Sequence, residues 1–156
     1  MKKPNFRKGI VAVIGVFIVI MTQAQRPKYF DNYQGLCDSL EEIYKVPSSL
    51  MMAVAYHESG GGTSRNARLL NNHFGIVGKN NLLKTHGIKS KYRAFASDTA
   101  GYVAFCKLVQ SKKFYSSYTL QTPVTKWVYA LWRTGYCPSE TWPKKVNYII
   151  NNYKVL

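Results

Sequence analysis

The feature that most constrains the fold is the run "LMMAVAYHESGGG", residues 50–62, which is apolar on nearly every face of a helix. A helix of that kind belongs in the centre of a domain. Ser48 or Ser49 is placed to cap its first amide groups, and residues 60–62 end it because glycine takes the left-handed conformation that closes a helix. We therefore expect a central buried helix with Glu58 at its C-terminal end.

Helical periodicity predicts further helices around this one, after a short polar lead-in over residues 26–34. They lie at residues 35–45, 63–72, 98–113, 122–135 and 139–156. The helix at 98–113 is expected to be capped by Ser97, and the helix at 122–135 by Thr122. Strand character is confined to residues 73–78 and 89–96, which a polar connection joins. The predicted fold class is mostly α (α+β), with a small β-hairpin lobe beside a helical body.

The N-terminus carries an export pattern. Four basic residues precede the uncharged run "GIVAVIGVFIVIM", residues 9–21, and the small and polar "TQAQ" follows. This run suits a secretory signal peptide, because a membrane span needs about 20 apolar residues. We expect residues 1–25 to be a signal peptide, with an uncleaved membrane anchor as the alternative, and residues 26–156 to be one exported domain in the periplasm or outside the cell.

The expected exported part is strongly basic. Residues 1–25 hold four of the 22 Lys and Arg and none of the seven acids, which leaves a net charge of +11 on the remainder. An excess of this size favours an anionic polymer, and for an exported protein that means a wall or surface polymer rather than nucleic acid. The alternative is that the charge serves only solubility.

Cysteine and histidine spacing gives no metal site. Three cysteines, Cys37, Cys106 and Cys137, predict one disulfide and one free buried thiol, and their spacing does not identify the pair. The chain has no CxxC sequence, and its three histidines lack the i, i+4 spacing of a metalloprotease pair. We expect neither a metal nor an organic cofactor.

Glu58 is the only acidic residue between Glu42 and Asp98. The negative end of the helix dipole and the apolar surroundings both disfavour its ionised form, which is what glycoside cleavage requires of its general acid. The glycines that follow would let a polymeric substrate approach the backbone closely. The alternative for such an acid is solvation or a salt bridge. Neighbouring His57 points about 100° away around the helix, so we expect it to be structural.

Three separated segments resemble one family in the same order. These are "AVAYHESGGGTSRNARLLNNHFGIVGK" (53–79), "YRAFASDTAGYVAF" (92–105) and "ALWRTGYCPSETWPKKVNYIINNY" (130–153). They resemble the motifs of the bacterial peptidoglycan glucosaminidases of the flagellar-muramidase and autolysin type, glycoside hydrolase family 73. The resemblance spans about residues 36 to 156. It implies a lysozyme-like fold, with a cleft between a helical body and a hairpin lobe, and peptidoglycan glycan strands as the substrate.

The resemblance also implies roles for individual residues. Glu58 matches the catalytic acid of the family, and Tyr136 matches a tyrosine that lies near it. Asn72, Phe74 and Gly75 match the segment that forms the floor of the sugar cleft. Trp132 is a further candidate for the cleft on its own spacing, because it lies close to Tyr136 in the sequence, although most tryptophans at helical spacing belong to the core.

The chain departs from the family pattern at three places. Residues 77–92 contain no acid, whereas many members carry a second acid in the hairpin lobe. Asp98 is the nearest acid downstream, but it follows Ser97 at a predicted helix start, where a role at the helix N-terminus is favoured. Gly61 stands where the family usually has tryptophan, and Cys137 with Pro138 replaces the usual Ala and Thr.

These observations leave more than one function open. The leading interpretation is an exported hydrolase of N-acetylglucosaminyl linkages in peptidoglycan, in which Glu58 is the general acid and the N-acetyl group of the substrate replaces the second acid. A wall-binding module without turnover and a lytic transglycosylase are the alternatives. A cysteine peptidase is a more distant one, because Cys106 or Cys137 would need a paired histidine.

Overall fold

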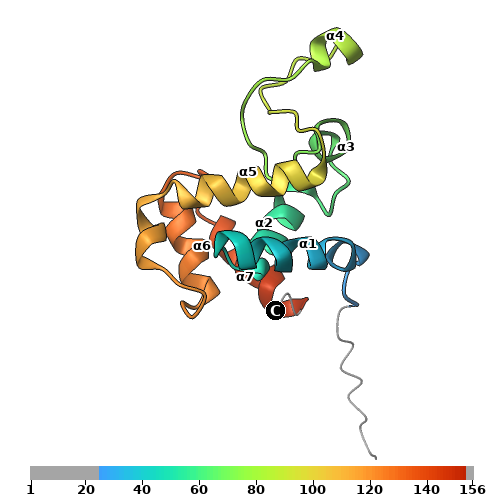
Figure 1. The fold of residues 1–156 in the computed structure, drawn as a ribbon. Helices are drawn as coiled ribbons and strands as arrows, with labels where there is room; N and C mark the ends of the chain where they lie inside the picture. Colours follow the sequence, from blue (N-terminus) through green and yellow to red (C-terminus); the bar gives the residue numbers. More distant parts are fainter. Residues whose placement is uncertain (1–24, 154–156) are drawn as a thin grey trace, which may run out of the picture.

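The computed structural model describes residues 25–153, which form a helical body and a smaller lobe that projects from it (Figure 1). The predicted signal peptide or anchor lies outside the described residues except for Gln25, so it stays a prediction together with the boundary at residue 26. None of the helices within residues 25–153 is long and apolar enough to cross a membrane.

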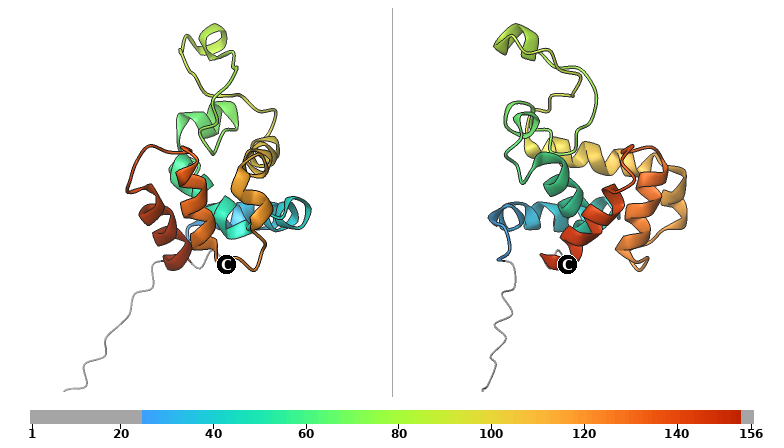
Figure 2. Two further views of the ribbon diagram at one scale, coloured as in Figure 1. Left: turned by 90° about the vertical axis from the view of Figure 1, so that its left-hand side faces the viewer. Right: turned by 180° about the vertical axis from the view of Figure 1, so that it is seen from behind.

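The helices follow one another in the predicted order, and the mostly helical fold class is confirmed. They are α1 (Lys28–Tyr44), α2 (Ser48–Ser59), α3 (Arg65–Leu70), α4 (Leu82–His86), α5 (Asp98–Gln110), the 3-10 helix η1 (Lys113–Ser117), α6 (Val124–Arg133) and α7 (Trp142–Asn152). Views from two further sides show α1, α5, α6 and α7 grouped around α2, while α4 stands apart at the tip of the lobe (Figure 2).

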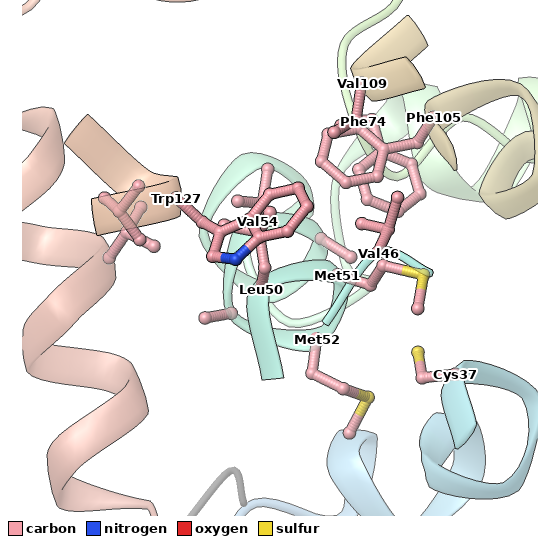
Figure 3. Packing of buried hydrophobic residues seen from close by; sticks show 14 of the residues in the cluster. Cys37, Val46, Leu50, Met51, Met52, Val54, Phe74, Phe105, Val109 and Trp127 are labelled. Carbon is pink, nitrogen blue, oxygen red and sulfur yellow. The ribbon is translucent and has the colours of Figure 1, made fainter. Parts of the chain in front are cut away.

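Helix α2 is the central element, as its composition predicts. It contacts α1, α5, α6 and α7, and six consecutive residues from Leu50 to Ala55 are completely buried. Figure 3 shows the side chains of Leu50, Met51, Met52 and Val54 pointing in different directions from this helix into the surrounding core. Because the surrounding helices pack against α2, they fix the direction of its axis and therefore the position of its last turn.

Helix α1 begins earlier than the sequence indicates. The predicted polar lead-in over residues 26–34 is wrong, because α1 starts at Lys28, directly after Pro27. Tyr29 and Phe30 are buried, and the ring of Phe30 packs at a tilt against Tyr56 of α2, with ring centroids 4.8 Å apart. These aromatic contacts are made with residues far along the chain, so the local pattern did not reveal them.

Two predicted helix caps are also wrong. Neither Ser48 nor Ser49 caps α2 through its side chain; instead the backbone N–H of Ser48 donates to the carboxylate of Glu41 on α1, at 2.5 Å. Thr122 does not cap α6, because its hydroxyl oxygen accepts from the backbone N–H of Thr119 and closes a turn before the helix. The predicted Ser97 cap of α5 is confirmed.

The lobe is a two-armed loop with hairpin pairing rather than two regular strands. Within the described residues the pairing reduces to one antiparallel bridge, between Val77 and Tyr92, with flanking backbone hydrogen bonds. The predicted strands over 73–78 and 89–96 are therefore corrected to extended arms, and the connection carries α4. The side-chain amide of Asn80 crosses the arms, donating to the carbonyl oxygens of Ser90 and Tyr92 at 2.9 and 2.8 Å.

The predicted disulfide is absent, since Cys37, Cys106 and Cys137 are all free thiols. Cys37 on α1 and Cys106 on α5 are both completely buried, and the Cys106 sulfur lies 3.2 Å from the sulfur of Met51. Burial raises the pKa of the Cys106 thiol to about 12 and raises that of Cys37 further. Both thiols act as core side chains, and Cys137 is half-buried in the loop after α6.

A buried polar cluster joins α1 and α5 to the segment before the lobe. His73 bonds to the hydroxyl of Tyr29 at 2.8 Å through Nδ1 and to the carboxylate of Asp98 at 3.1 Å through Nε2. Tyr33 donates to the other oxygen of Asp98 at 2.6 Å, and Tyr102 bonds to Tyr29. Asp98 is thus held by this cluster in the first turn of α5, which agrees with the structural role expected for it.

Candidate active site

A groove lies between the lobe and the helical body, and Glu58 is in its wall. The groove has a volume of about 530 Å³. Four segments line it: the end of α2, the base of the lobe, the last turn of α5 with Lys112 beyond it, and the loop after α6. The lining residues are Glu58, Phe74, Gly75, Ile76, Val77, Lys91, Tyr92, Leu108, Lys112, Thr134, Gly135, Tyr136, Cys137 and Pro138.

The carboxylate of Glu58 is held in a defined position. Its Oε1 accepts a hydrogen bond from the indole N–H of Trp142 on α7, at 2.6 Å. Its Oε2 faces Gly75, where an added Cβ would lie 3.8 Å from that oxygen. Since Trp142 is only 1% exposed, the indole cannot move away without disturbing the core. One oxygen of Glu58 is therefore anchored and the other faces the groove.

The floor of the groove is the segment that contains Phe74 and Gly75. Phe74 is buried and stacks on Phe105 of α5, with ring centroids 4.2 Å apart. Gly75 has a φ of +66°, a backbone conformation that residues other than glycine rarely adopt. The chain turns there to pass directly beneath the Glu58 carboxylate. Both residues line the groove, and their role in binding a sugar stays a prediction.

Asn72 supports this floor from below. It is 1% exposed, and its amide donates to the carbonyl oxygens of Ile76 and Arg93 at 2.9 and 2.8 Å. Its Oδ1 accepts from the backbone N–H of Ile76 at 3.0 Å. Because these bonds occupy the side chain and bury it, Asn72 does not reach the groove. Its side chain joins the two arms of the lobe at their base, and a contact of Asn72 with substrate stays a prediction.

Tyr136 lines the opposite wall. Its hydroxyl donates to the carbonyl oxygen of Phe74 at 2.8 Å, and its ring lies 5.4 Å from the ring of Trp142. Burial raises the pKa of Tyr136 well above its ordinary value, and the nearby Glu58 adds to the effect. The hydroxyl therefore stays protonated at neutral pH. Tyr136 ties the loop after α6 to the groove floor, close to Glu58.

Trp132 and His57 lie outside the groove lining. The indole N–H of Trp132 donates to the carbonyl oxygen of Ser139 at 3.1 Å, which fixes the loop between α6 and α7. His57 is half-buried, and burial lowers its pKa, with Glu58 opposing the shift and Lys145 adding to it. The structure thus separates Trp132 from the five other predicted residues, which gather at or directly under the groove.

The glycines after Glu58 do not approach the groove either. Residues 60–62 all have positive φ and turn the chain away from α2. A Cβ at Gly61 would lie 3.0 Å from the ring of Tyr56 at a φ of +65°, so the tryptophan usual in the family would require a strained backbone and a shift of that ring. These glycines close the helix, and Gly61 and Gly62 pack against the rings of Tyr56 and Tyr29; the approach of a polymer to them stays a prediction.

The groove is otherwise basic. Lys91 from the lobe and Lys112 after α5 line it, while Glu58 is the one acid among the lining residues. Asp98, the nearest acid downstream, is not among the lining residues, and its two carboxylate oxygens bond to Tyr33 and His73. Over residues 25–153 no group of three or more His, Cys, Asp and Glu side chains is arranged to hold a metal ion.

A cleft between a helical body and a small lobe, with one anchored glutamate facing it, defines a glycoside hydrolase of lysozyme-like fold. The family described as "Mannosyl-glycoprotein endo-beta-N-acetylglucosaminidase", the glucosaminidase family, matches residues 34–155. The chain belongs to this family, glycoside hydrolase family 73, as the three sequence motifs imply.

Solved structures share the fold. The catalytic domain of the autolysin Auto from Listeria monocytogenes is 19% identical, with a TM-score of 0.68 over 86% of this chain and 89% of that chain. A C-terminally truncated glycoside hydrolase domain of Salmonella typhimurium FlgJ is 20% identical, with a TM-score of 0.65 over 83% and 97%. The peptidoglycan hydrolase of Sphingomonas sp. A1 is 20% identical, with a TM-score of 0.65 over 82% of this chain and 89% of that chain. A search of curated protein sequences found no match.

Three groups at the site were missed by the sequence reasoning. Trp142, which anchors Glu58, was read only as one of several core tryptophans. Lys91 and Lys112 were counted within the overall charge but not placed at the groove. The type of a residue does not show that it lies at the groove, because only the fold brings α7, the lobe and the end of α5 to one place.

Proposed function

We propose that the chain is an exported hydrolase of bacterial peptidoglycan that cleaves the β-1,4 linkages of N-acetylglucosaminyl residues, with Glu58 as the proton donor. The observation that carries the proposal is the anchored Glu58 carboxylate, whose Oε2 faces the groove above Gly75. The substrate class is supported by family membership and by the peptidoglycan hydrolase of Sphingomonas sp. A1 among the structures of the same fold.

The proposed reaction begins with Glu58 in its protonated form. The carboxylic acid gives its proton to the glycosidic oxygen as the bond from that oxygen to the anomeric carbon breaks. No second carboxylate lines the groove, so the acetamido oxygen of the same sugar forms the new bond to the anomeric carbon and gives a cyclic oxazolinium. Water then attacks that carbon and gives a proton to the Glu58 carboxylate. The acetamido group is restored, and the anomeric configuration is retained.

The other predicted residues position this chemistry. Tyr136 and Asn72 hold the floor segment under Glu58 from opposite sides, through the hydrogen bonds to Phe74 and Ile76. Phe74 and Gly75 form the surface against which the sugar lies. Trp142 fixes the rotation of the Glu58 carboxylate, so that one oxygen stays aimed at the glycosidic bond.

Glu58→Gln tests the role of the acid. It keeps the shape of the side chain and removes the transferable proton, so release of saccharides from purified peptidoglycan is expected to fall roughly 10²- to 10⁴-fold. Glu42→Gln on the exposed face of α1 is the matched control, with unchanged activity expected. Undiminished wall clearing by Glu58→Gln would remove Glu58 from the mechanism.

Product analysis tests the reaction class. Mass spectrometry is expected to find reducing N-acetylglucosamine ends, and NMR of a soluble substrate is expected to show the retained anomer first. Anhydro-muramic ends would instead identify a lytic transglycosylase, and inversion would refute the acetamido step. The lack of a second acid in the groove also favours a wall-binding module without turnover. Binding to peptidoglycan without release of any saccharide would establish that alternative.

A further inference from the structure

A second pocket adjoins the groove at the end of α5. It has a volume of about 550 Å³ and is lined by residues of η1 and α6 and of the segment that follows α5. Its lining residues are Ser111, Lys112, Lys113, Phe114, Tyr118, Ala130, Arg133 and Thr134. Lys112 and Thr134 line the groove as well, so the two hollows share a border. A ligand in the groove can therefore extend into this second pocket without leaving the surface.

The lining of the second pocket is basic. Lys112, Lys113 and Arg133 contribute three cations, and no acid is among the lining residues. None of the three forms a salt bridge in the part of the chain that the structure describes. Unpaired cations around one hollow create a positive potential that attracts anions, and guanidinium and ammonium groups bind carboxylates by charge-assisted hydrogen bonds.

One wall of the pocket is a fixed aromatic surface. Phe114 and Tyr118 lie 5.3 Å apart between ring centroids, and each contacts the completely buried Trp127 edge-on. Rings held against a buried tryptophan lose little freedom when a ligand covers them. The pocket thus combines cations with a rigid apolar wall, a combination suited to an amphipathic organic anion rather than to a small inorganic ion.

We propose that this basic pocket binds the carboxylates of the peptides attached to the glycan strand that lies in the groove. The inference rests on the proposed function, because it takes the ligand in the groove to be peptidoglycan. Peptides branch from every second sugar of that polymer, so a strand in the groove brings a peptide to its border. The peptide supplies both free carboxylates for the cations and aliphatic side chains for the aromatic wall, whereas a further neutral sugar would leave three cations without partners.

Binding of defined strands to paired variants tests the proposal. The test variant is Lys113→Gln with Arg133→Gln, which removes two exposed cations of the pocket and leaves the groove lining intact. The control is Lys126→Gln with Lys144→Gln, which removes the same charge from exposed positions outside both hollows. All are made in the Glu58→Gln background so that strands stay whole, and thermal melting confirms that each variant folds.

The probes are soluble glycan strands that carry peptides, the same strands after an amidase has removed the peptides, and a chito-oligosaccharide. For the peptide-bearing strands, the test variant is expected to raise Kd by roughly three- to tenfold at low salt, the range of two exposed ion pairs. Its Kd for the other two probes, and every Kd of the control variant, are expected to stay unchanged. Stripped strands keep a lactyl carboxylate on the sugar itself, so they separate that source of negative charge from the peptide.

Three results would overturn the proposal. The first is that the test variant loses as much affinity for stripped strands as for peptide-bearing strands. The second is that it loses no affinity for peptide-bearing strands. The third is that the control variant loses as much affinity for those strands as the test variant does. The proposed function fails by a different measurement, namely saccharide release by the chain with Glu58 intact. Peptide-dependent binding without saccharide release would support the peptide-binding role of the pocket and refute the hydrolase activity. Glu58-dependent saccharide release without peptide-dependent binding would support the hydrolase activity and refute the peptide-binding role.

Discussion

The hydrogen bond from Trp142 to Glu58 is the contact whose removal tests the site most directly. The bond is 2.6 Å long, its donor is 1% exposed, and its acceptor is a carboxylate. A hydrogen bond to a charged group stabilises a fold by about 2 kcal/mol, and the smaller ring of Trp142→Phe loses about 1 kcal/mol of packing. We expect an unfolding free energy lower by about 3 kcal/mol, which is a fall in Tm of about 12 °C.

Trp142→Phe in the Glu58→Gln background should lower the unfolding free energy by a smaller amount. A neutral amide oxygen accepts a weaker bond, worth about 1 kcal/mol, so the total cost is expected to be about 2 kcal/mol. The difference of about 1 kcal/mol between the two backgrounds is the coupling between the indole and the charge of Glu58. Urea unfolding of the four proteins in the cycle measures it.

The activity of Trp142→Phe is expected to fall as well. With Oε1 released, the carboxylate can rotate away from the groove, and a displacement of about 1 Å costs roughly 100-fold in rate. Trp132→Phe is the control, because it removes an indole donor that bonds to a loop carbonyl oxygen outside the groove lining. Equal costs of Trp142→Phe in both Glu58 backgrounds, within about 0.5 kcal/mol, would refute the proposed anchoring.

Three further predictions concern the rest of the molecule. Asn72→Asp puts a carboxylate against two carbonyl oxygens and should lower the unfolding free energy by about 3 kcal/mol in urea titrations; a loss under about 1 kcal/mol would contradict the supporting role of Asn72. Burial lowers the pKa of His73, so the unfolded chain binds that proton more readily, and stability should fall as the pH drops through about 6.5 toward the folded pKa. Urea midpoints at about pH 7.5 and about pH 5.5 measure this, and an equal pH dependence in His73→Gln would rule out His73 as a source. A thiol reagent should label Cys137 alone in the folded chain and all three cysteines after unfolding, since two are buried; an internal disulfide in non-reducing mass analysis would contradict this.

Local sequence features were sufficient to predict the helical framework. The continuous apolar character of residues 50–55 requires a buried helix whatever surrounds it, and the structure buries all six. The predicted cap Ser97 likewise acts within one helix, and the structure confirms it. Features of this kind depend on neighbours within about four residues, so they can be predicted from the local sequence.

Features that depend on distant partners were missed or misread. Glu41 caps α2 in place of a serine side chain, because the packing of α1 on α2 brings its carboxylate to the backbone N–H of Ser48. Tyr29 and Phe30 extend α1 because their partners lie on α2 and in the residue 73 segment. The cysteines are unpaired, and the Cys106 sulfur contacts the sulfur of Met51 on α2 instead.

By itself the sequence determined that a buried helix ends in a lone acid, and its motifs pointed to a family and to Glu58. Only the tertiary structure decided what surrounds that acid: an indole from α7, a glycine turn from the base of the lobe, and lysines from the lobe and from the end of α5. The physical reason is that helix formation is governed by contacts a few residues apart, whereas this site is assembled from segments as much as 84 residues apart. Their meeting depends on the packing of the whole core.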